Sequence, residues 1–385
     1  MFKKEGYSFN SVLQFLTATL LVGLTAIPAT AQAVELRYAT FHPTVNNVYK
    51  RAVLPFVDRV AKATGGAVTI KTYPGGQLAN IKTTITALRN GTADAGVLIP
   101  IFVPSEVPSH NALQQVLFAG ANPIAAAGAS VETVVLGCPG CRKDLEAAGA
   151  VSVLPVATTA YRMQCAKDVP NTASLKGRKI RIVGGAQKTL LQELGATRVV
   201  VPPADVMEGM NRGVLDCAVT PLPWLVQFSM KESVHYIIDE PLGYARTIEF
   251  FVLRKASWEK LSPEQRRTVF KEFPQLAADS VIEGYLYDDE RVIKVAKDKG
   301  IKFIKPDAAF TKAVDAARAA EKEVAFADAK KRKVPNFPAV WAHHQRALAK
   351  WEKLSRDIGT DPKKFAQALW DNVYSKIDPL TMLPK

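Results

Sequence analysis

The sequence predicts an α/β protein with two lobes of similar build and long helices at its carboxyl end. Short apolar segments with the two-residue alternation of strands are separated by segments with the 3.6-residue spacing of amphipathic helices. This order occurs twice before residue 241. About 350 residues follow an amino-terminal leader, which is more than one hydrophobic core usually supports. We therefore expect two lobes.

The leader has the pattern of a secretory signal peptide. Two lysines precede an apolar run from Val12 to Pro28, and Ala31-Gln32-Ala33 places small residues where a signal peptidase reads. A retained membrane anchor is the alternative, but the run is short for a span of roughly 20 residues and no second run follows. We expect a signal peptide over 1–33 and a soluble mature protein in the periplasm.

The first lobe is expected to alternate strands and helices from the start. The expected strands lie over 35–40, 67–73 and 93–99, and the expected helices over 49–64 and about 80–90. A β-α-β-α-β order predicts a parallel sheet, with ligands beyond the carboxyl ends of its strands.

The alternation then repeats, with expected strands over 151–154, 162–165, 179–183, 199–201 and 215–219 and helices near 187–194 and 204–212. After residue 241 the pattern changes to a strand over 248–253 and then to long helices. Ser262-Pro263-Glu264-Gln265 opens a further helix with a capping box. No low-complexity linker is present, so several crossings should join the lobes. We expect lobe I over 34–158 plus about 247–285, and lobe II over 159–246 plus about 286–385.

The net charge of +14 at pH 7 admits nucleic acid, a membrane surface or small anions as partners. Basic residues are spread along the chain, and the densest cluster, 330–333, is typical of a solvated helix end. No aromatic-basic repeat of the kind that stacks bases is present, and nucleic acid is a poor partner for an exported protein. A positive field that attracts small organic anions fits best.

The four cysteines, Cys138, Cys141, Cys165 and Cys217, imply disulfides with three possible pairings in an oxidising compartment. Cys138-Pro139-Gly140-Cys141 has the spacing of a redox motif, so a thiol-disulfide protein is one alternative function. The aromatic residue and βαβ unit of a thioredoxin-like site are absent around it. A zinc site built from two cysteine pairs is not favoured, because the sequence has only one closely spaced pair. We expect structural bridges and no metal.

An exported hydrolase is a further alternative that the sequence does not favour. The five histidines, His42, His110, His235, His343 and His344, have no recognisable nucleophile beside them. The adjacent pair at 343 and 344 points its rings in different directions on a helix, so it is a poor metal site. We expect neither an enzyme nor a cofactor.

Arg181 lies where the strand over 179–183 runs into a Gly-Gly turn. A guanidinium offers two parallel donors with a fixed charge, which suits a carboxylate that enters a partly dry cleft. A surface or lobe-stabilising salt bridge is the alternative. We interpret Arg181 as a carboxylate clamp.

Five segments, in order and with matching spacing, resemble the signature segments of solute-binding proteins of tripartite ATP-independent periplasmic (TRAP) transporters. They are Thr64-Gly65-Gly66, residues 73–78 (YPGGQL), residues 175–181 (LKGRKIR), Leu194-Gly195-Ala196 and Gly213-Val214-Leu215-Asp216. The resemblance runs from about Val34 to at least Trp258. It implies a type II-like periplasmic binding protein that closes on an organic acid and delivers it to small and large permease subunits.

The resemblance also implies where the ligand binds. The arginine that pairs with the carboxylate corresponds to Arg181, and a second arginine corresponds to Arg162. Gln77 and Asn80 begin a helix whose amino end faces the cleft and favours anions. Apolar wall candidates, each at a strand end or in a loop near the cleft, are Phe41, Tyr161, Trp224 and Phe250.

Departures from the family pattern narrow the ligand class. Thr220 replaces a carboxamide that often contacts ligand, Ile99 replaces an acidic residue of sugar-acid binders, and Pro203 replaces an aromatic residue. A cleft with fewer polar side chains can form hydrogen bonds with fewer ligand hydroxyls. Each buried polar group without a partner costs about 1–3 kcal/mol of free energy. We expect a small or aromatic, largely apolar carboxylate rather than a sugar acid.

Within this resemblance we expect a Cys165–Cys217 bridge beside the site and a Cys138–Cys141 bridge elsewhere. A ligand-sensing protein without a permease stays an alternative, because the sequence does not separate sensing from transport. A homodimer formed through the long carboxy-terminal helices is also possible.

Overall fold

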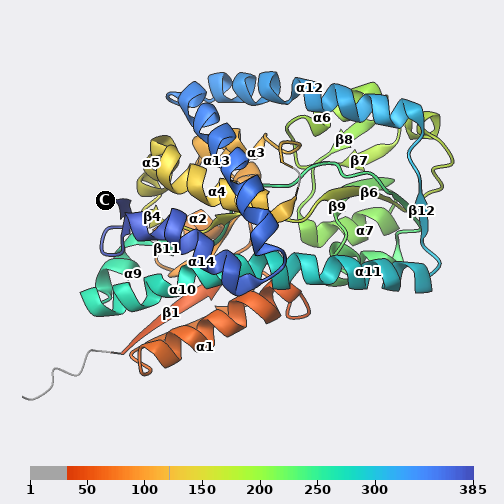
Figure 1. The fold of residues 1–385 in the computed structure, drawn as a ribbon. Coiled ribbons are helices and arrows are strands. Elements are labelled where there is room, and N and C mark those ends of the chain that lie inside the picture. Colours follow the sequence, from red (N-terminus) through yellow and green to blue (C-terminus); the bar gives the residue numbers. More distant parts are fainter. Residues whose placement is uncertain (1–32, 121) are drawn as a thin grey trace, which may run out of the picture. The chain divides into compact units, whose positions relative to one another are not determined.

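Two six-stranded sheets with a mixture of parallel and antiparallel strands carry the fold (Figure 1). The computed structural model describes residues 33–120 and 122–385. Apart from Ala33, the predicted signal peptide lies outside the described residues.

The first sheet has the order β2-β1-β3-β11-β4, with β5 also paired to β11. Its strands are β1 (Val34–Ala39), β2 (Val68–Tyr73), β3 (Ala95–Leu98), β4 (Ala150–Val151), β5 (Pro155–Val156) and β11 (Ile248–Arg254). β1 pairs in parallel with β2 and β3, as the alternation predicts, and β11 is antiparallel to its neighbours.

The second sheet has the order β12-β10-β6-β9-β7-β8. Its strands are β6 (Tyr161–Cys165), β7 (Lys179–Arg181), β8 (Thr197–Val199), β9 (Cys217–Pro221), β10 (Tyr236–Ile238) and β12 (Lys302–Ile304). β7 lies in parallel between β9 and β8, while β6 is antiparallel to β9 and β10. β10 and β12 were not expected from the sequence, and both pair with strands that are distant in the chain.

In the described residues the chain passes between strands of the two sheets three times. Residues 157–160 join β5 to β6, and residues 239–247 join β10 to β11. The third passage runs through α9 (Lys255–Lys260), α10 (Pro263–Val281) and α11 (Tyr287–Asp298). A π-helical turn, Ile282–Leu286, joins α10 to α11, and the two helices extend along both sheets in Figure 1. The expected joining of the lobes by several crossings is confirmed.

The remaining helices cover the sheets. They are α1 (Leu54–Ala63), α2 (Thr84–Arg89), α3 (Pro108–Gln114), α4 (Pro123–Gly137), α5 (Pro139–Ala147), α6 (Gln187–Glu193), α7 (Val206–Asn211), α8 (Trp224–Gln227), α12 (Ala308–Lys331), α13 (Phe337–Ile358) and α14 (Pro362–Asn372). A short hairpin, β13 (Ile377–Asp378) and β14 (Leu383–Pro384), follows. The long carboxy-terminal helices expected from the sequence are therefore present.

The carboxy-terminal helices contact helices from several parts of the chain. α13 packs along α4, α14 packs against α10, and α12 packs against both α6 and α3. The assignment of residues 286–385 to the second lobe stays a prediction, as do the other lobe boundaries. The capping box at the start of α10 is present, because Ser262 and Gln265 each bond the other's backbone N–H through their side chains.

Among residues 33–120 and 122–385, no single helix is long and apolar enough to cross a membrane. Only the pair α4 and α5 together reaches that length and apolarity, with a 76° bend between the two helices.

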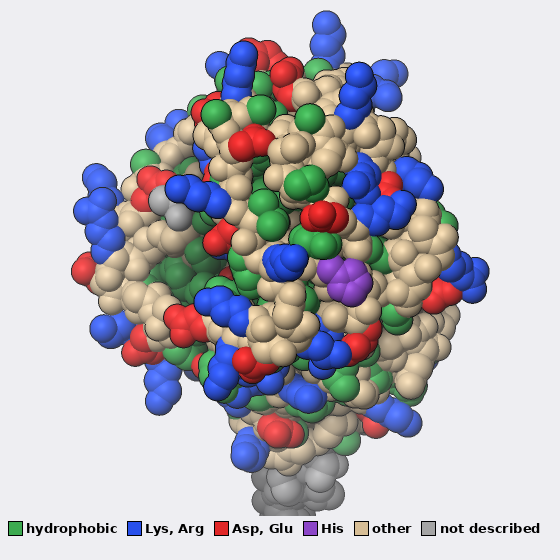
Figure 2. Space-filling view, turned by 90° about the vertical axis from the view of Figure 1, so that its right-hand side faces the viewer, with side chains coloured by type: hydrophobic (Ala, Val, Ile, Leu, Met, Phe, Trp, Pro, Cys, Tyr) green, Lys and Arg blue, Asp and Glu red, His purple; other side chains and the backbone are tan. Residues whose placement is uncertain are grey.

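Charged side chains are interspersed on the face shown in Figure 2. Lysine and arginine side chains are scattered across this face, with aspartate and glutamate among them. On this face the positive charge therefore forms no single basic patch of the kind that binds nucleic acid.

The close packing of α13 on α4 depends on a glycine. Trp351 of α13 is fully buried, and its Nε1 donates to Glu132 of α4 at 2.7 Å. A Cβ added at Gly128 of α4 would lie 2.2 Å from the Trp351 ring. The indole therefore packs directly on the α4 backbone.

We predict that Gly128→Ala lowers the free energy of unfolding by about 1–3 kcal/mol, because the added methyl overpacks a rigid ring. Thermal unfolding followed by circular dichroism measures the effect. The matched control is Gly209→Ala in α7, where the nearest atom to a Cβ is a flexible leucine methyl at 3.1 Å. That variant should be neutral or more stable, since alanine favours helix. Equal melting points for the two variants would contradict this account of the α4–α13 contact.

Candidate functional site

A narrow cavity of about 20 Å³ lies where residues from the two sheets meet. The first sheet and its loops contribute Phe41, Ile99, Ile248 and Phe250, and the second sheet and its loops contribute Tyr161, Arg181, Val183, Pro203 and Trp224. Phe102, Gln114, Thr158, Ala245 and Tyr285 complete the lining. Phe41, Ile99 and Arg181 lie at or just beyond the carboxyl ends of parallel strands, which is where α/β sheets bind ligands.

Arg181 is the one charged side chain in this lining. It ends β7, and only 1% of its surface is exposed. Its Nη1 donates to the Val219 carbonyl at 3.1 Å, and its Nε makes a longer bond to the Val201 carbonyl at 3.4 Å. These carbonyls belong to β9 and to the segment after β8, on either side of β7. The flanking strands therefore hold the guanidinium in place.

No carboxylate in the described residues pairs with Arg181. The Trp224 ring lies 5.2 Å from its guanidinium carbon and supplies a cation–π contact. Burial lowers the pKa of the guanidinium, and the Tyr161 hydroxyl partly offsets this effect. An arginine nevertheless stays protonated in proteins. The cavity therefore contains a positive charge that a ligand anion would compensate.

Arg246 is a second buried arginine, but unlike Arg181 it lies near an acidic side chain. Its Nη1 donates to the Val116 carbonyl at 2.7 Å, and its Nη2 donates to the Ala119 carbonyl. Burial lowers the pKa of Arg246 to about 10, but the nearby Glu321 carboxylate opposes the shift. Glu321 in turn accepts the backbone N–H of Leu117 at 2.6 Å. Arg246 thus lies near an acidic side chain of the same chain, and it does not line the cavity.

Two further polar candidates, Arg162 and Thr220, lie outside the cavity lining. Neighbouring residues of a strand point to opposite faces, and on β6 it is Tyr161 that lines the cavity. Arg162 instead pairs with Asp239, with 2.8 Å between Nε and Oδ1. Thr220 lies opposite Arg162 in the β6–β9 register, and its hydroxyl accepts Gln164 Nε2 at 2.8 Å. Ligand contacts of these two residues stay a prediction.

The other expected residues divide between the cavity and its surroundings. The apolar candidates Phe41, Ile99, Tyr161, Trp224 and Phe250 all line the cavity. Gln77 is exposed and outside the lining, and Asn80 lines a neighbouring cavity.

Sequence reasoning missed three polar residues of the lining. Gln114 comes from α3, Thr158 from the first crossing and Tyr285 from the π-helical turn. Thr158 joins two crossings, because its N–H donates to the Ala245 carbonyl at 3.0 Å and its hydroxyl accepts the Ala245 N–H at 3.2 Å. No strand-end or motif signal marks these positions, since only the folded crossings bring them to the cavity.

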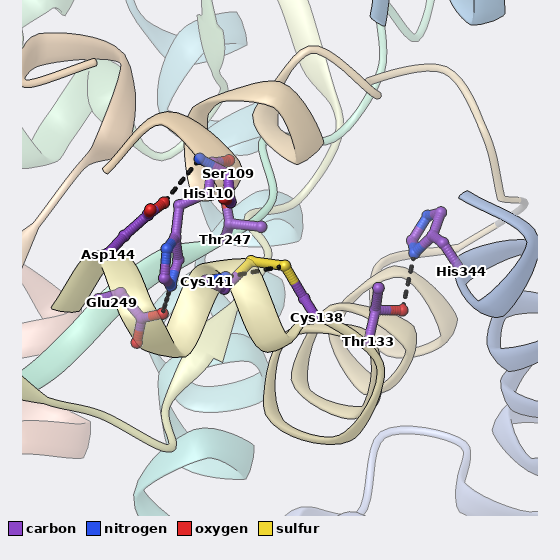
Figure 3. Close-up of a disulfide and its surroundings, with 9 residues drawn as sticks. All are labelled: Ser109, His110, Thr133, Cys138, Cys141, Asp144, Thr247, Glu249 and His344. Carbon is purple, nitrogen blue, oxygen red and sulfur yellow. Dashed lines mark hydrogen bonds and ion pairs between the residues drawn. A yellow bond between two sulfur atoms is a disulfide. The ribbon is translucent and has the colours of Figure 1, made fainter. Parts of the chain in front are cut away.

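Both expected disulfides are confirmed. Cys165 and Cys217 are paired across β6 and β9, with Cα atoms 4.0 Å apart. Cys138 and Cys141 close a local bridge at the start of α5 (Figure 3). Cys138 is 3% exposed, Cys141 is fully buried, and both belong to an apolar cluster. Exchange with another thiol needs an accessible sulfur, so this burial favours a structural role.

The histidines do not form a hydrolytic site in the described residues. His110 points at Glu249, at 3.1 Å, and Ser152 donates to the same carboxylate (Figure 3 shows the first pair). His42 and His344 bond threonine hydroxyls, and burial lowers the pKa of each to about 3. A general base works best with a pKa near the operating pH. These imidazoles are therefore poor bases for activating a nucleophile.

The chain belongs to the family of bacterial extracellular solute-binding proteins, family 7, whose model matches residues 38–327. This family consists of solute-binding proteins, so the expectation that the chain is no enzyme is confirmed. The resemblance to TRAP solute-binding proteins is likewise confirmed.

Three proteins that are similar to this chain follow. A solute-binding protein of Albidiferax ferrireducens is 26% identical over 260 residues, which cover 66% of this chain and 74% of that protein. A marine-metagenome TRAP protein specific for aromatic acids, solved with 3-hydroxybenzoate, has a TM-score of 0.71 at 22% identity over 83% of this chain and 99% of that one. A Rhodoferax ferrireducens TRAP protein, solved with copurified benzoate, has a TM-score of 0.71 at 20% identity over 84% and 100% of the two chains.

Asp289 of α11 lies beside the first crossing. Its carboxylate accepts the Thr159 hydroxyl at 3.3 Å, next to Thr158 of the cavity. Burial raises the pKa of Asp289 to about 7, although the positive charge of Arg162 opposes the rise. Between about pH 4 and pH 7 the folded protein therefore keeps Asp289 protonated. An unfolded chain, in which the pKa is near 3.8, releases this proton over the same range.

We predict that Asp289 makes the protein less stable as the pH rises from about 4 to about 7. A carboxyl whose pKa is raised on folding favours the folded state below its unfolded pKa, and this advantage is lost through its folded pKa. Asp289→Asn should flatten the decline in melting temperature between pH 4 and pH 7. The control is Glu290→Gln, at the exposed neighbouring position, which should keep the wild-type slope. The same slope in all three proteins would show that Asp289 does not titrate in this range.

Proposed function

We propose that this chain is the extracytoplasmic solute-binding subunit of a TRAP transporter and that it captures a small aromatic, or otherwise largely apolar, carboxylate. One observation carries the proposal: Arg181 is a buried guanidinium in a mostly apolar cavity, without a carboxylate partner in the described residues. A ligand carboxylate would supply the missing negative charge through two parallel hydrogen bonds.

The lining favours an apolar body on this acid. Apart from Arg181, its side-chain polar groups are an amide, a threonine hydroxyl, two tyrosine hydroxyls and an indole N–H, from Gln114, Thr158, Tyr161, Tyr285 and Trp224. Phe41, Phe102, Trp224 and Phe250 supply aromatic surface. A sugar acid has several hydroxyls, and each one left unpaired costs about 1–3 kcal/mol. The aromatic acids bound by two proteins of the same fold support the same class of ligand.

The cavity is narrow, and its walls come from both sheets. We infer that the two lobes separate to admit the acid and close around it, and that the closed form delivers it to the small and large permease subunits in the periplasm. Ligand sensing would use the same site, and neighbouring genes for the permease subunits would distinguish transport from sensing.

We predict that benzoate or phenylacetate raises the melting temperature of the wild-type protein, because a ligand that binds only the folded state stabilises it by mass action. At 100 times Kd the gain is about 2.7 kcal/mol. D-Glucuronate, which a Citrobacter koseri protein of similar fold binds, should give a much smaller shift. Differential scanning fluorimetry with a panel of organic acids measures these shifts.

We predict that Arg181→Lys weakens carboxylate binding by about 10- to 100-fold, because lysine keeps the charge but loses the two-pronged donor. The matched control is Arg178→Lys, three residues earlier, where the side chain bonds the carbonyls of Ser174 and Asp168. It should bind like the wild type by isothermal titration calorimetry. The proposal is wrong if Arg181→Lys binds normally, or if neutral sugars or amines shift the melting temperature and no acid does.

A further inference from the structure

We propose that a second cavity beside the first is an outer compartment of the same binding site, and that it takes a neutral, hydrogen-bonding end of the ligand. The inference rests on the proposed function, because it assumes that a carboxylate binds Arg181. It narrows the ligand class to elongated aryl carboxylates with a hydroxyl group at the end far from the carboxylate.

The outer compartment has a volume of about 220 Å³ and walls from both halves of the fold. Phe41 and the segment before α2, residues 80–82, come from the side of the first sheet. Residues 202–205, which lie between β8 and α7, come from the side of the second sheet. Like the inner cavity, it is therefore built from segments that follow strands of both sheets.

Two side chains belong to both cavities. Phe41 and Pro203 line the inner cavity with Arg181, and they also line the outer compartment. Phe41 follows β1 of the first sheet, whereas Pro203 follows β8 of the second, so the shared boundary joins two different sheets. The Phe41 ring stacks near Phe228, with 6.3 Å between centroids. A ligand longer than the inner cavity would pass between Phe41 and Pro203.

The sizes of the two cavities support a ligand that occupies both. The inner cavity is narrow, with free space of about 20 Å³, whereas the outer compartment has free space of about 220 Å³. A compact acid such as benzoate would use only the inner cavity. A longer acid would also reach the outer compartment, where it could bury more surface.

The outer compartment differs from the inner cavity in its charges. Lys82 and Asp205 contribute one positive and one negative side chain, and both are exposed. In the part of the chain that the structure describes, neither side chain has an ion-pair or hydrogen-bond partner. A charged ligand end would be attracted by one of them and repelled by the other. A hydroxyl suits both, because it can donate to the Asp205 carboxylate and accept from the Lys82 ammonium.

The position of Lys82 is set by its own segment. Asn80 Oδ1 accepts the Lys82 N–H at 2.9 Å, and the Asn80 carbonyl accepts the Thr84 hydroxyl at 2.9 Å. These bonds hold the backbone before α2 and leave the Lys82 ammonium free to turn toward a ligand. The two charged side chains of the outer compartment thus come from opposite walls. Lys82 belongs to the 80–84 segment, and Asp205 directly precedes α7.

The test compares 3-(4-hydroxyphenyl)propanoate, 3-phenylpropanoate and benzoate by isothermal titration calorimetry. In the wild-type protein the hydroxyl should improve affinity over 3-phenylpropanoate by about 3- to 10-fold, the usual net gain from one or two hydrogen bonds. In the double variant Lys82→Met, Asp205→Ala, this gain should fall to less than about twofold. Benzoate should bind both proteins equally, because it reaches only the inner cavity.

The control is the double variant Lys62→Met, Asp58→Ala on α1, which makes the same changes at two exposed positions outside both cavities. It should keep the full hydroxyl gain. Equal affinity of the wild type for the two propanoates, or a gain that survives in the Lys82 and Asp205 variant, would overturn the outer compartment while carboxylate binding stands. If no acid of the series binds the wild type, the proposed function fails and this inference fails with it.

Discussion

The uncompensated charge of Arg181 is the constraint on which the arrangement around the cavity depends. A guanidinium loses hydration when it is buried, and the loss must be offset by hydrogen bonds or by an anion. Here the carbonyls of Val219 and Val201 offset part of it, and the Trp224 ring contributes a cation–π contact. These groups come from β9, from the segment that follows β8, and from α8. The order of the strands therefore gives the guanidinium hydrogen-bond acceptors, but in the described residues it gives no carboxylate that would neutralise the charge.

The comparison between Arg181 and Arg246 shows why burial alone does not identify a binding residue. Both guanidinium groups are almost fully buried and bond backbone carbonyls. Glu321 of α12 lies near Arg246 and lowers the cost of burying its charge. Arg246 therefore connects the loop after α3 to the second crossing. The charge of Arg181, in contrast, is available to pair with a ligand anion.

Several parts of the site could be predicted from the sequence because they follow strand ends. Phe41, Ile99 and Arg181 come at or directly after predicted strands, and parallel strands direct their carboxyl ends to one edge of a sheet. Arg162 illustrates where such reasoning stops. Its neighbour Tyr161 lines the cavity, and a shift of one residue along a strand reverses the face. The segment pattern located β6 correctly, but it did not determine which residues of β6 point toward the ligand.

The sequence by itself determined the alternation of strands and helices, the family and the presence of a guanidinium at the end of β7, because these depend on local periodicity and short motifs. Tertiary structure alone decided which residues share a cavity. Gln114, Thr158 and Tyr285 reach it from a helix, a crossing and a π-helical turn that are far apart in the chain. The pairing of Arg162 with Asp239, and the absence of any such partner for Arg181 in the described residues, also depend on contacts between distant segments. Local patterns carry no information on such contacts, since they arise only when the sheets and crossings pack together.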